Sequence, residues 1–113
     1  MELASERCEA CRPDSPMVPE SDEAALLAEI PEWQLIDVNG VKHLKRVIKV
    51  KGWMPAVDLT TRIAALAEET DHHPAILTEW GRVTVEWWTH AIKGLHRNDF
   101  VMAAKVDALL SEQ

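Results

Sequence analysis

The sequence is poor in cysteine, in basic residues and in long apolar runs, and each shortage excludes a class of protein. Its 113 residues include 2 cysteines, too few for a disulfide framework, which favours a reduced, cytoplasmic protein. The 12 lysines and arginines stand against 19 aspartates and glutamates, and the net charge of −7 argues against direct binding to nucleic acid. No apolar run approaches the roughly 20 residues that cross a bilayer. The acidic first residues also lack the apolar core of a signal peptide.

Residues 1–20 have the composition of a flexible N-terminal tail. Prolines recur among acidic and small polar residues, and no apolar period develops. Cys8 and Cys11 have the spacing of half a zinc site, but a structural site needs four ligands and the chain has no second pair. We interpret them as a passive pair and leave a weak metal or redox role open. Residues 21–113 are expected to form a single domain.

Three segments of the chain have helical patterns. Ser21 is expected to cap a short helix that Pro31 ends. Pro55 suits the first position of a longer helix, which must end by His73 because the residue before Pro74 is pushed out of the helical region. A third apolar stripe predicts a helix over residues 97–110.

Four extended segments pair into two hairpins, because a turn signal separates the members of each pair. Asn39-Gly40 is typical of a type I′ turn, and Gly81 marks the second turn. The segments are residues 33–38, 41–50, 75–80 and 83–90. Short turns imply antiparallel pairing, and one-faced helices need a sheet to cover. The sequence therefore predicts an α+β two-layer sandwich, a four-stranded antiparallel sheet with three helices on one face, in the order α-β-β-α-β-β-α.

Side chains alternate along these predicted strands. Trp87 is assigned to the core face of the last strand, and Trp88 and His90 to the opposite face. Whether Trp88 contacts a ligand or an interface is left open. His43 and His96 are interpreted as surface or capping residues. A basic stretch on the second strand is interpreted as a solvated or edge-protecting face: Lys42, Lys45, Arg46 and Lys49.

Three of the 5 histidines gather with carboxylates around one predicted corner. His72 and His73 follow the long helix and are flanked by acidic residues, and His90 and Asp99 follow further along the chain. Imidazole titrates near neutral pH and a carboxylate can orient it, so this mixture is typical of an acid/base site. Two other interpretations remain open. The adjacent histidines could be a solvated helix C-cap, or three histidines could bind catalytic zinc, although no H-x-x-x-H spacing is present.

The spacing of these residues is specific. An acidic residue, His-His-Pro, an aromatic residue, a histidine and an aspartate follow one another at fixed intervals: Glu68, His72, His73, Pro74, Trp80, His90 and Asp99. This pattern resembles the signature of the pterin-4a-carbinolamine dehydratase family. The similarity runs from about Ser21 to the C-terminus and includes Trp33 and residues 92–100.

The resemblance implies an activity and a set of roles. The expected reaction dehydrates 4a-hydroxytetrahydropterin to quinonoid dihydropterin, the recycling step after aromatic amino acid hydroxylation, and it needs no metal or nucleotide cofactor. The expected catalytic residues are His72, His73 and His90. His72 and His90 are expected to act as the acid/base pair, and His73 to hold and polarise the pterin and to share the base role. The expected substrate-binding or orienting residues are Glu68, Asp71, Trp88, Thr89, Ala91, Asp99 and Trp33. Some relatives carry a small polar residue in place of Trp88, which bears on the width of the pocket.

The resemblance also implies partners. We expect a homodimer or a dimer of dimers, with an aromatic amino acid hydroxylase or a regulatory protein as a further partner, and neither nucleic acid nor membrane. The alternative is a non-enzymatic coregulator or assembly factor on the same dimerising fold. A protein of that kind would be free to lose its histidines, and this chain keeps all three.

Overall fold

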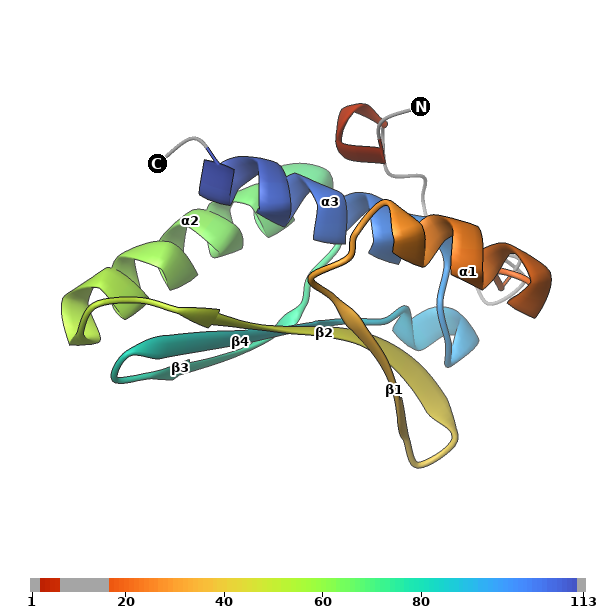
Figure 1. The fold of residues 1–113 in the computed structure, drawn as a ribbon, viewed down its shortest axis with the longest axis horizontal. Helices are drawn as coiled ribbons and strands as arrows, with labels where there is room; N and C mark the ends of the chain where they lie inside the picture. Colours follow the sequence, from red (N-terminus) through yellow and green to blue (C-terminus); the bar gives the residue numbers. More distant parts are fainter. Residues whose placement is uncertain (1–2, 7–16, 112–113) are drawn as a thin grey trace.

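The computed structural model describes residues 3–6 and 17–111 as a four-stranded antiparallel sheet with helices on one face (Figure 1). The strand order is β1-β2-β4-β3. The elements are η1 (Leu3–Ser5), α1 (Glu20–Ala28), β1 (Gln34–Val38), β2 (Val41–Lys49), α2 (Trp53–Thr70), β3 (Ala75–Glu79), β4 (Arg82–Trp87), η2 (His90–Ile92) and α3 (Arg97–Ser111). The predicted architecture and element order are confirmed. Cys8 and Cys11 lie outside the described residues.

Two tight turns set the register of the sheet. Asn39 and Gly40 both have positive φ, 52° and 83°, as a type I′ turn requires, and Val38 pairs with Val41 across it. The Asp37 carboxylate accepts a hydrogen bond from the Gly40 N–H at 2.8 Å, which stabilises the turn. In the second hairpin Gly81 has a φ of 80°.

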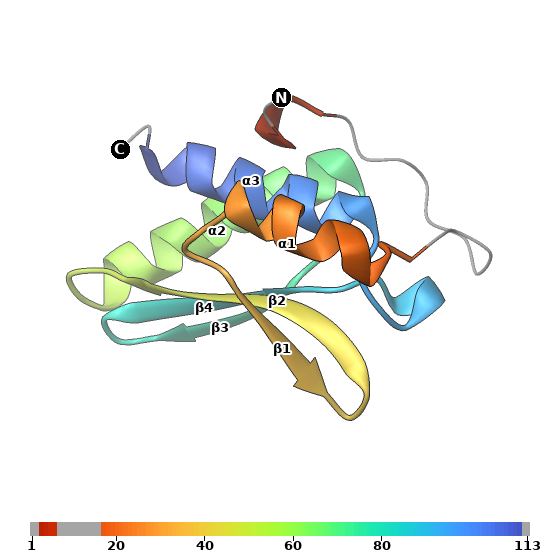
Figure 2. The ribbon, with the colours of Figure 1, turned by 45° about the vertical axis from the view of Figure 1, so that its right-hand side comes forward.

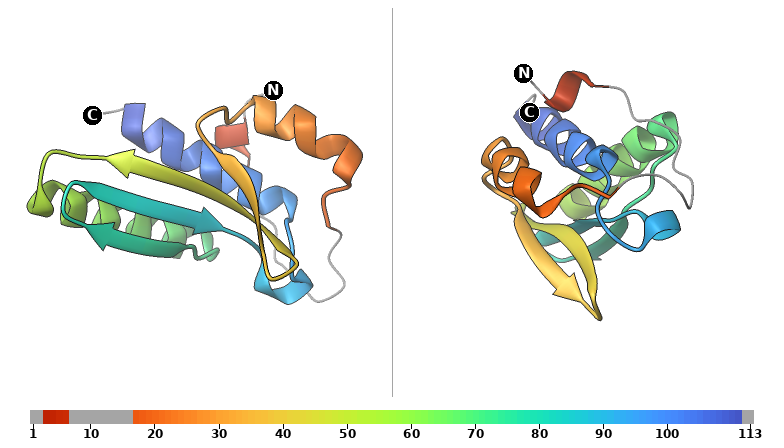
Figure 3. Two further views of the ribbon diagram at one scale, coloured as in Figure 1. Left: turned by 60° about the horizontal axis from the view of Figure 1, so that its bottom comes forward. Right: turned by 90° about the vertical axis from the view of Figure 1, so that its right-hand side faces the viewer.

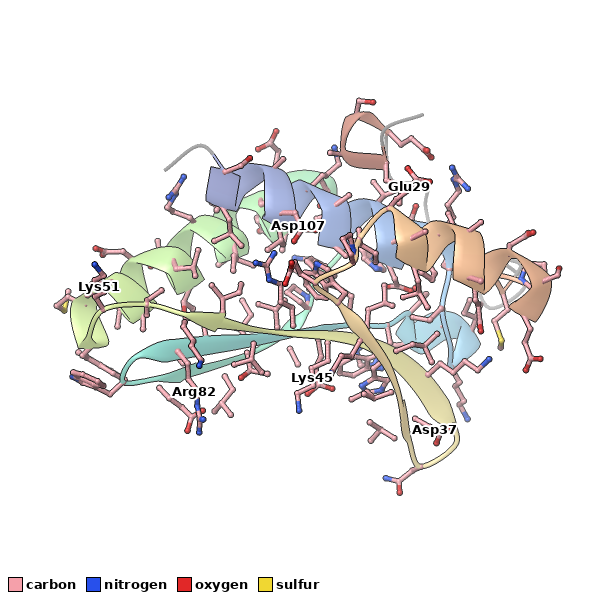
Figure 4. The ribbon with its side chains drawn as sticks, in the orientation of Figure 1. Glu29, Asp37, Lys45, Lys51, Arg82 and Asp107 are labelled. Atoms are coloured by element: carbon pink, nitrogen blue, oxygen red, sulfur yellow. The ribbon has the colours of Figure 1, made fainter. Side chains whose placement is uncertain are left out.

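The core lies between the sheet and the helices, which cover the same face of the sheet in every view (Figure 3). The α3 helix is buried along most of its length, because the sheet lies beneath it and neighbouring elements flank it. Side chains from β2, β4, α2 and α3 fill this layer, among them Leu44, Ile48, Val83, Val85, Trp87, Leu59, Ile63, Phe100 and Val106. The opposite face of the sheet carries no helix among the described residues, and Lys45 and Arg82 project from it (Figure 4).

Trp33 belongs to this core. Its side chain is 5% exposed, and its indole N–H donates to the Asp107 carboxylate at 2.8 Å. Arg46 donates to the same carboxylate. The network ties β2 and the segment before β1 to α3 (Figure 4, Asp107).

Several predicted boundaries are wrong for local reasons. The α1 helix begins at Glu20 with Pro19 at its N-cap, so Ser21 lies within the first turn and does not cap it. The α2 helix begins at Trp53 after Gly52, whose φ of 130° favours glycine, so Pro55 is its third residue. The β4 strand ends at Trp87, and His90 lies in the short helix η2.

The described N-terminal residues pack against α3 (Figure 2). Leu3 is 2% exposed, and Glu6 forms a two-point ion pair with Arg97 at 2.8 and 2.7 Å. The Arg97 guanidinium lowers the pKa of the Glu6 carboxyl below its usual value. The Val18 N–H donates to the Leu95 carbonyl at 2.8 Å. Residues 3–6 and 17–20, which the sequence assigns to a tail, make these contacts. In the described part of the chain, no helix is long and apolar enough to span a membrane.

Candidate active site

The site begins where α2 ends. Asp71 adopts the left-handed conformation (φ 55°, ψ 39°), which aspartate tolerates better than most residues. The Asp71 N–H donates to the Glu68 carbonyl and the His72 N–H to the Ala67 carbonyl, the pair of bonds of a Schellman motif. The chain therefore turns sharply after the helix, and Pro74 keeps it extended into β3. This turn directs both adjacent histidines away from the axis of α2.

His72 points into the protein. Its side chain is 10% exposed, and Nε2 lies 2.7 Å from Oδ1 of Asp99, which is fully buried. The Trp87 indole lies nearly parallel to the imidazole, with 5.7 Å between ring centroids. Nδ1 of His72 has no hydrogen-bond partner among the described residues. The carboxylate therefore fixes the ring through one nitrogen and leaves the other for a ligand.

Asp99 has three partners, which explains how a carboxylate can be buried here. Oδ2 accepts hydrogen bonds from the Thr89 hydroxyl at 2.7 Å and from the His96 backbone N–H at 2.9 Å. His96 is the residue before α3, and its Nδ1 accepts from the Asn98 N–H at 3.0 Å. The two bonds form a reciprocal cap on the start of α3, with histidine at the N-cap. Asp99 thus connects the helix cap, the segment after β4 and His72.

His73 points outward. Its Nε2 lies 2.8 Å from Oε1 of Glu68, one turn back on α2, and the side chains are 55% and 81% exposed. Water screens a pair of this kind, so it orients the imidazole with little stabilisation.

The third histidine comes from the segment after β4. Thr89 forms an isolated bridge with Gly94, and the short helix η2 lies in the loop between them. His90 opens this helix and its imidazole contacts the Trp88 indole, with ring centroids 4.7 Å apart and planes tilted by 49°.

These segments enclose a cavity of about 330 Å³, lined by Asp71, His72, His73, Pro74, Trp88, Thr89, His90 and Ala91. The structure brings all three predicted histidines to it, with Asp99 bonded to His72. Glu68 is not among the lining residues and reaches the site only through His73. Trp33, predicted to pack beside the substrate, also does not line the cavity and lies in the core with Asp107.

A larger hollow of about 370 Å³ lies on the bare face of the sheet. Its lining includes Lys45, Leu77, Thr84 and Glu86, with no histidine among the lining residues. The acid/base groups are at the smaller cavity, and we place the site there.

Sequence reasoning missed the surroundings of His43. The residue is 7% exposed, bonded to Glu86 and stacked on Trp88, so for His43 the surface or capping interpretation is wrong. His96 does cap a helix, as one of its two interpretations predicted, but it too is buried. The strand pattern gave the face on which His43 lies but carried no signal for what covers it. Within residues 3–6 and 17–111, no group of three or more His, Cys, Asp or Glu side chains is arranged to hold a metal ion.

The fold and the site together define a class of protein: a small α+β domain with three imidazoles around one cavity and a buried carboxylate behind one of them. The family model described as pterin 4 alpha carbinolamine dehydratase matches residues 16–109. The chain belongs to the pterin-4a-carbinolamine dehydratase family, whose members are hydro-lyases.

Two relatives and one solved structure show how closely the chain follows the family. A protein of Nitrosococcus oceani is 52% identical over 109 residues, covering 96% of both chains, and one of Gloeobacter violaceus is 49% identical over 112 residues, covering 99% of this chain and 97% of its own. The first is named "Putative pterin-4-alpha-carbinolamine dehydratase" and the second "Putative pterin-4-alpha-carbinolamine dehydratase 1". A crystal structure from Brucella melitensis, described as a transcriptional coactivator/pterin dehydratase, is 31% identical with a TM-score of 0.74, covering 83% of this chain and 98% of its own.

Proposed function

We propose that this protein dehydrates 4a-hydroxytetrahydropterin to quinonoid dihydropterin by general acid/base catalysis with histidines. The observation that carries the proposal is the single cavity lined by His72, His73 and His90, with one imidazole fixed by a buried aspartate. Family membership supplies the substrate class, and the relatives' names agree with it.

The reaction requires two proton transfers. One proton is delivered to the C4a hydroxyl, which leaves as water when the C–O bond breaks. The other is removed from the ring nitrogen, whose electron pair forms the new C=N bond. Each positioned acid or base contributes on the order of 10²–10⁴-fold to the rate.

The geometry supports a division of these roles. An imidazole that donates from Nε2 to Asp99 has, in its neutral form, an unprotonated Nδ1 that can accept a proton, which suits His72 to the role of base. His90 lines the same cavity and has no such carboxylate among the described residues, so it is assigned as the acid. His73, Asp71 and the backbone groups of Thr89 and Ala91 would hold the flat ring.

The test compares single variants with wild type in dehydration of 4a-hydroxytetrahydropterin. His72→Ala and His90→Ala should each lower kcat/KM by about 10²–10⁴-fold while the protein stays folded by circular dichroism. Arg62→Ala, at an exposed position on α2, is the control and should keep wild-type activity. Full activity in both histidine variants would overturn the role assignment.

We also propose that the protein assembles as a homodimer or a dimer of dimers. It would work in the cytoplasm, where an aromatic amino acid hydroxylase would supply its substrate. Val47 and Leu77, on the bare face of the sheet, are 47% and 57% exposed, and apolar surface of this kind favours assembly. Sedimentation equilibrium of the full chain tests the stoichiometry. A monomer at micromolar concentration would contradict the proposal.

A further inference from the structure

His43 is buried on the bare face of the sheet, where its neighbours are not. Val47, also on β2, is 47% exposed, whereas His43 is 7% exposed. The Trp88 indole covers His43: the two ring centroids are 3.9 Å apart and the planes differ by 1°. The two rings are stacked face to face.

Glu86 contacts the edge of the His43 ring. Nδ1 of His43 lies 2.9 Å from Oε1 of Glu86, whose side chain is 27% exposed. Glu86 and Trp88 are two residues apart, so their side chains leave the same face of the sheet. Glu86 pairs in register with Lys45, which projects from the bare face (Figure 4). The His43 ring is thus fixed by a hydrogen bond at Nδ1 and by a stack on one of its faces.

The backbone alone does not hold Trp88 in place. The paired residues of β2 and β4 end at Leu44 and Trp87, so Trp88 is the first residue beyond the ladder. Trp88 nevertheless lines the cavity, and its indole contacts His90. The contacts run from Glu86 to His43, then to Trp88 and to the cavity.

We infer that His43 is a positioning residue that, held by Glu86, fixes the Trp88 indole as a wall of the cavity and thereby limits the size of the pterin side chain that the enzyme accepts. The inference rests on the proposed function. The wall acts by excluding bulk, and a change of about one methylene in a pocket alters discrimination by roughly 10–200-fold.

The experiment measures a specificity ratio. The kcat/KM values of 4a-hydroxytetrahydropterins with a 6-methyl and a 6-(1,2-dihydroxypropyl) group are compared for each variant. Both substrates meet the same fraction of folded protein, so partial unfolding cancels in the ratio. His43→Ala should shift the ratio about tenfold toward the larger substrate, and Trp88→Ala should shift it at least as far.

Three further variants separate positioning from general destabilisation. His43→Phe keeps a flat ring under the indole and should stay within about threefold of the wild-type ratio. In a Trp88→Ala background, His43→Ala should add nothing, because the wall it positions is gone. Glu79→Gln, a change of carboxylate on the same sheet but paired with Arg82, should leave the ratio unchanged.

The outcomes distinguish the two proposals. A wild-type protein inactive on both substrates would overturn the proposed function and the specificity role with it. An active wild type whose ratio is unchanged in His43→Ala would overturn this inference alone, as would additive effects of His43→Ala and Trp88→Ala.

Discussion

Two neighbouring histidines form the same kind of pair in opposite environments. His72 lies 2.7 Å from Asp99, and His73 lies 2.8 Å from Glu68. The first pair is 10% and 0% exposed, and the second is 55% and 81% exposed. Contact distance therefore says little about what a pair does. Burial decides, because an exposed pair is worth about 0–1 kcal/mol, whereas leaving a buried charge without its partner costs about 3–5 kcal/mol.

The largest effect is expected from Asp99→Asn, which breaks the buried pair without changing its shape. Three groups donate hydrogen bonds to the two carboxylate oxygens of Asp99. Asparagine has one acceptor oxygen and an NH₂ group, so the NH₂ group would face at least one of these donors. We expect the free energy of unfolding to fall by about 3 kcal/mol and the catalytic efficiency to fall at least about 10²-fold. Urea denaturation and the dehydration assay measure the two effects.

Thr89→Val is the matched control for Asp99→Asn. It removes one donor and keeps the carboxylate beside His72, so we expect about 1 kcal/mol of destabilisation and a smaller loss of activity. If both variants behaved like wild type, Asp99 would be a spectator and the buried pair would have no special role.

The next effect concerns the left-handed turn at Asp71, immediately before the two histidines. Asp71→Ala places a β-carbon without a polar group in the left-handed conformation and should destabilise the protein by about 1 kcal/mol. Asp71→Gly relieves the backbone and should stay within about 0.5 kcal/mol of wild type. Thermal unfolding of the two variants side by side isolates the backbone term, because both lose the carboxylate. Equal stability of the two would show that the left-handed backbone conformation at this position carries no cost that glycine relieves.

Much of the fold was predictable, because local patterns and the final structure agree. Asn39-Gly40 encoded its turn, and Pro74 with the preceding helix located the histidine corner. The contacts of His43 were not predictable, because alternation along a strand gives a residue's face but not what covers it. Trp88, beyond the ladder, covers that face by a tertiary contact with no local signal.

Tertiary contacts without a local sequence signal also decide the exposure of the His73–Glu68 pair and the position of Trp33. Sequence spacing put Glu68 and Asp99 in one signature, but burial depends on how α3 packs over the sheet, which no single segment encodes. Trp33 was predicted to open the first strand, but β1 begins at Gln34. A partner 74 residues away, Asp107, decides where the Trp33 indole points.

Glu68→Gln tests the exposed pair and should have a smaller effect than Asp99→Asn. The amide can still orient His73, and water screens the lost charge, so stability should change by less than about 0.5 kcal/mol. KM should rise by no more than about threefold with kcat unchanged. A fall in kcat comparable with that of Asp99→Asn would place Glu68 in direct contact with the reacting pterin.

The smallest effect is expected at a third ion pair, whose exposure is intermediate between those of the two histidine pairs. The Glu6 side chain is 23% exposed, and that of its partner Arg97 is 43% exposed. Arg97 lowers the pKa of Glu6 in the folded state. The ion pair therefore stabilises the protein at pH values above the usual glutamate pKa of about 4.3. This contribution is lost as the pH falls through the lowered pKa. Glu6→Gln should therefore be less stable by about 0.5 kcal/mol at pH 7 and equal to wild type at strongly acidic pH, and salt should reduce the difference at pH 7. Urea denaturation as a function of pH measures this, with Glu32→Gln, at an exposed position outside the pair, as the control. A difference that persisted at acidic pH would mean that Glu6 acts through packing beside Leu3 and not through its charge.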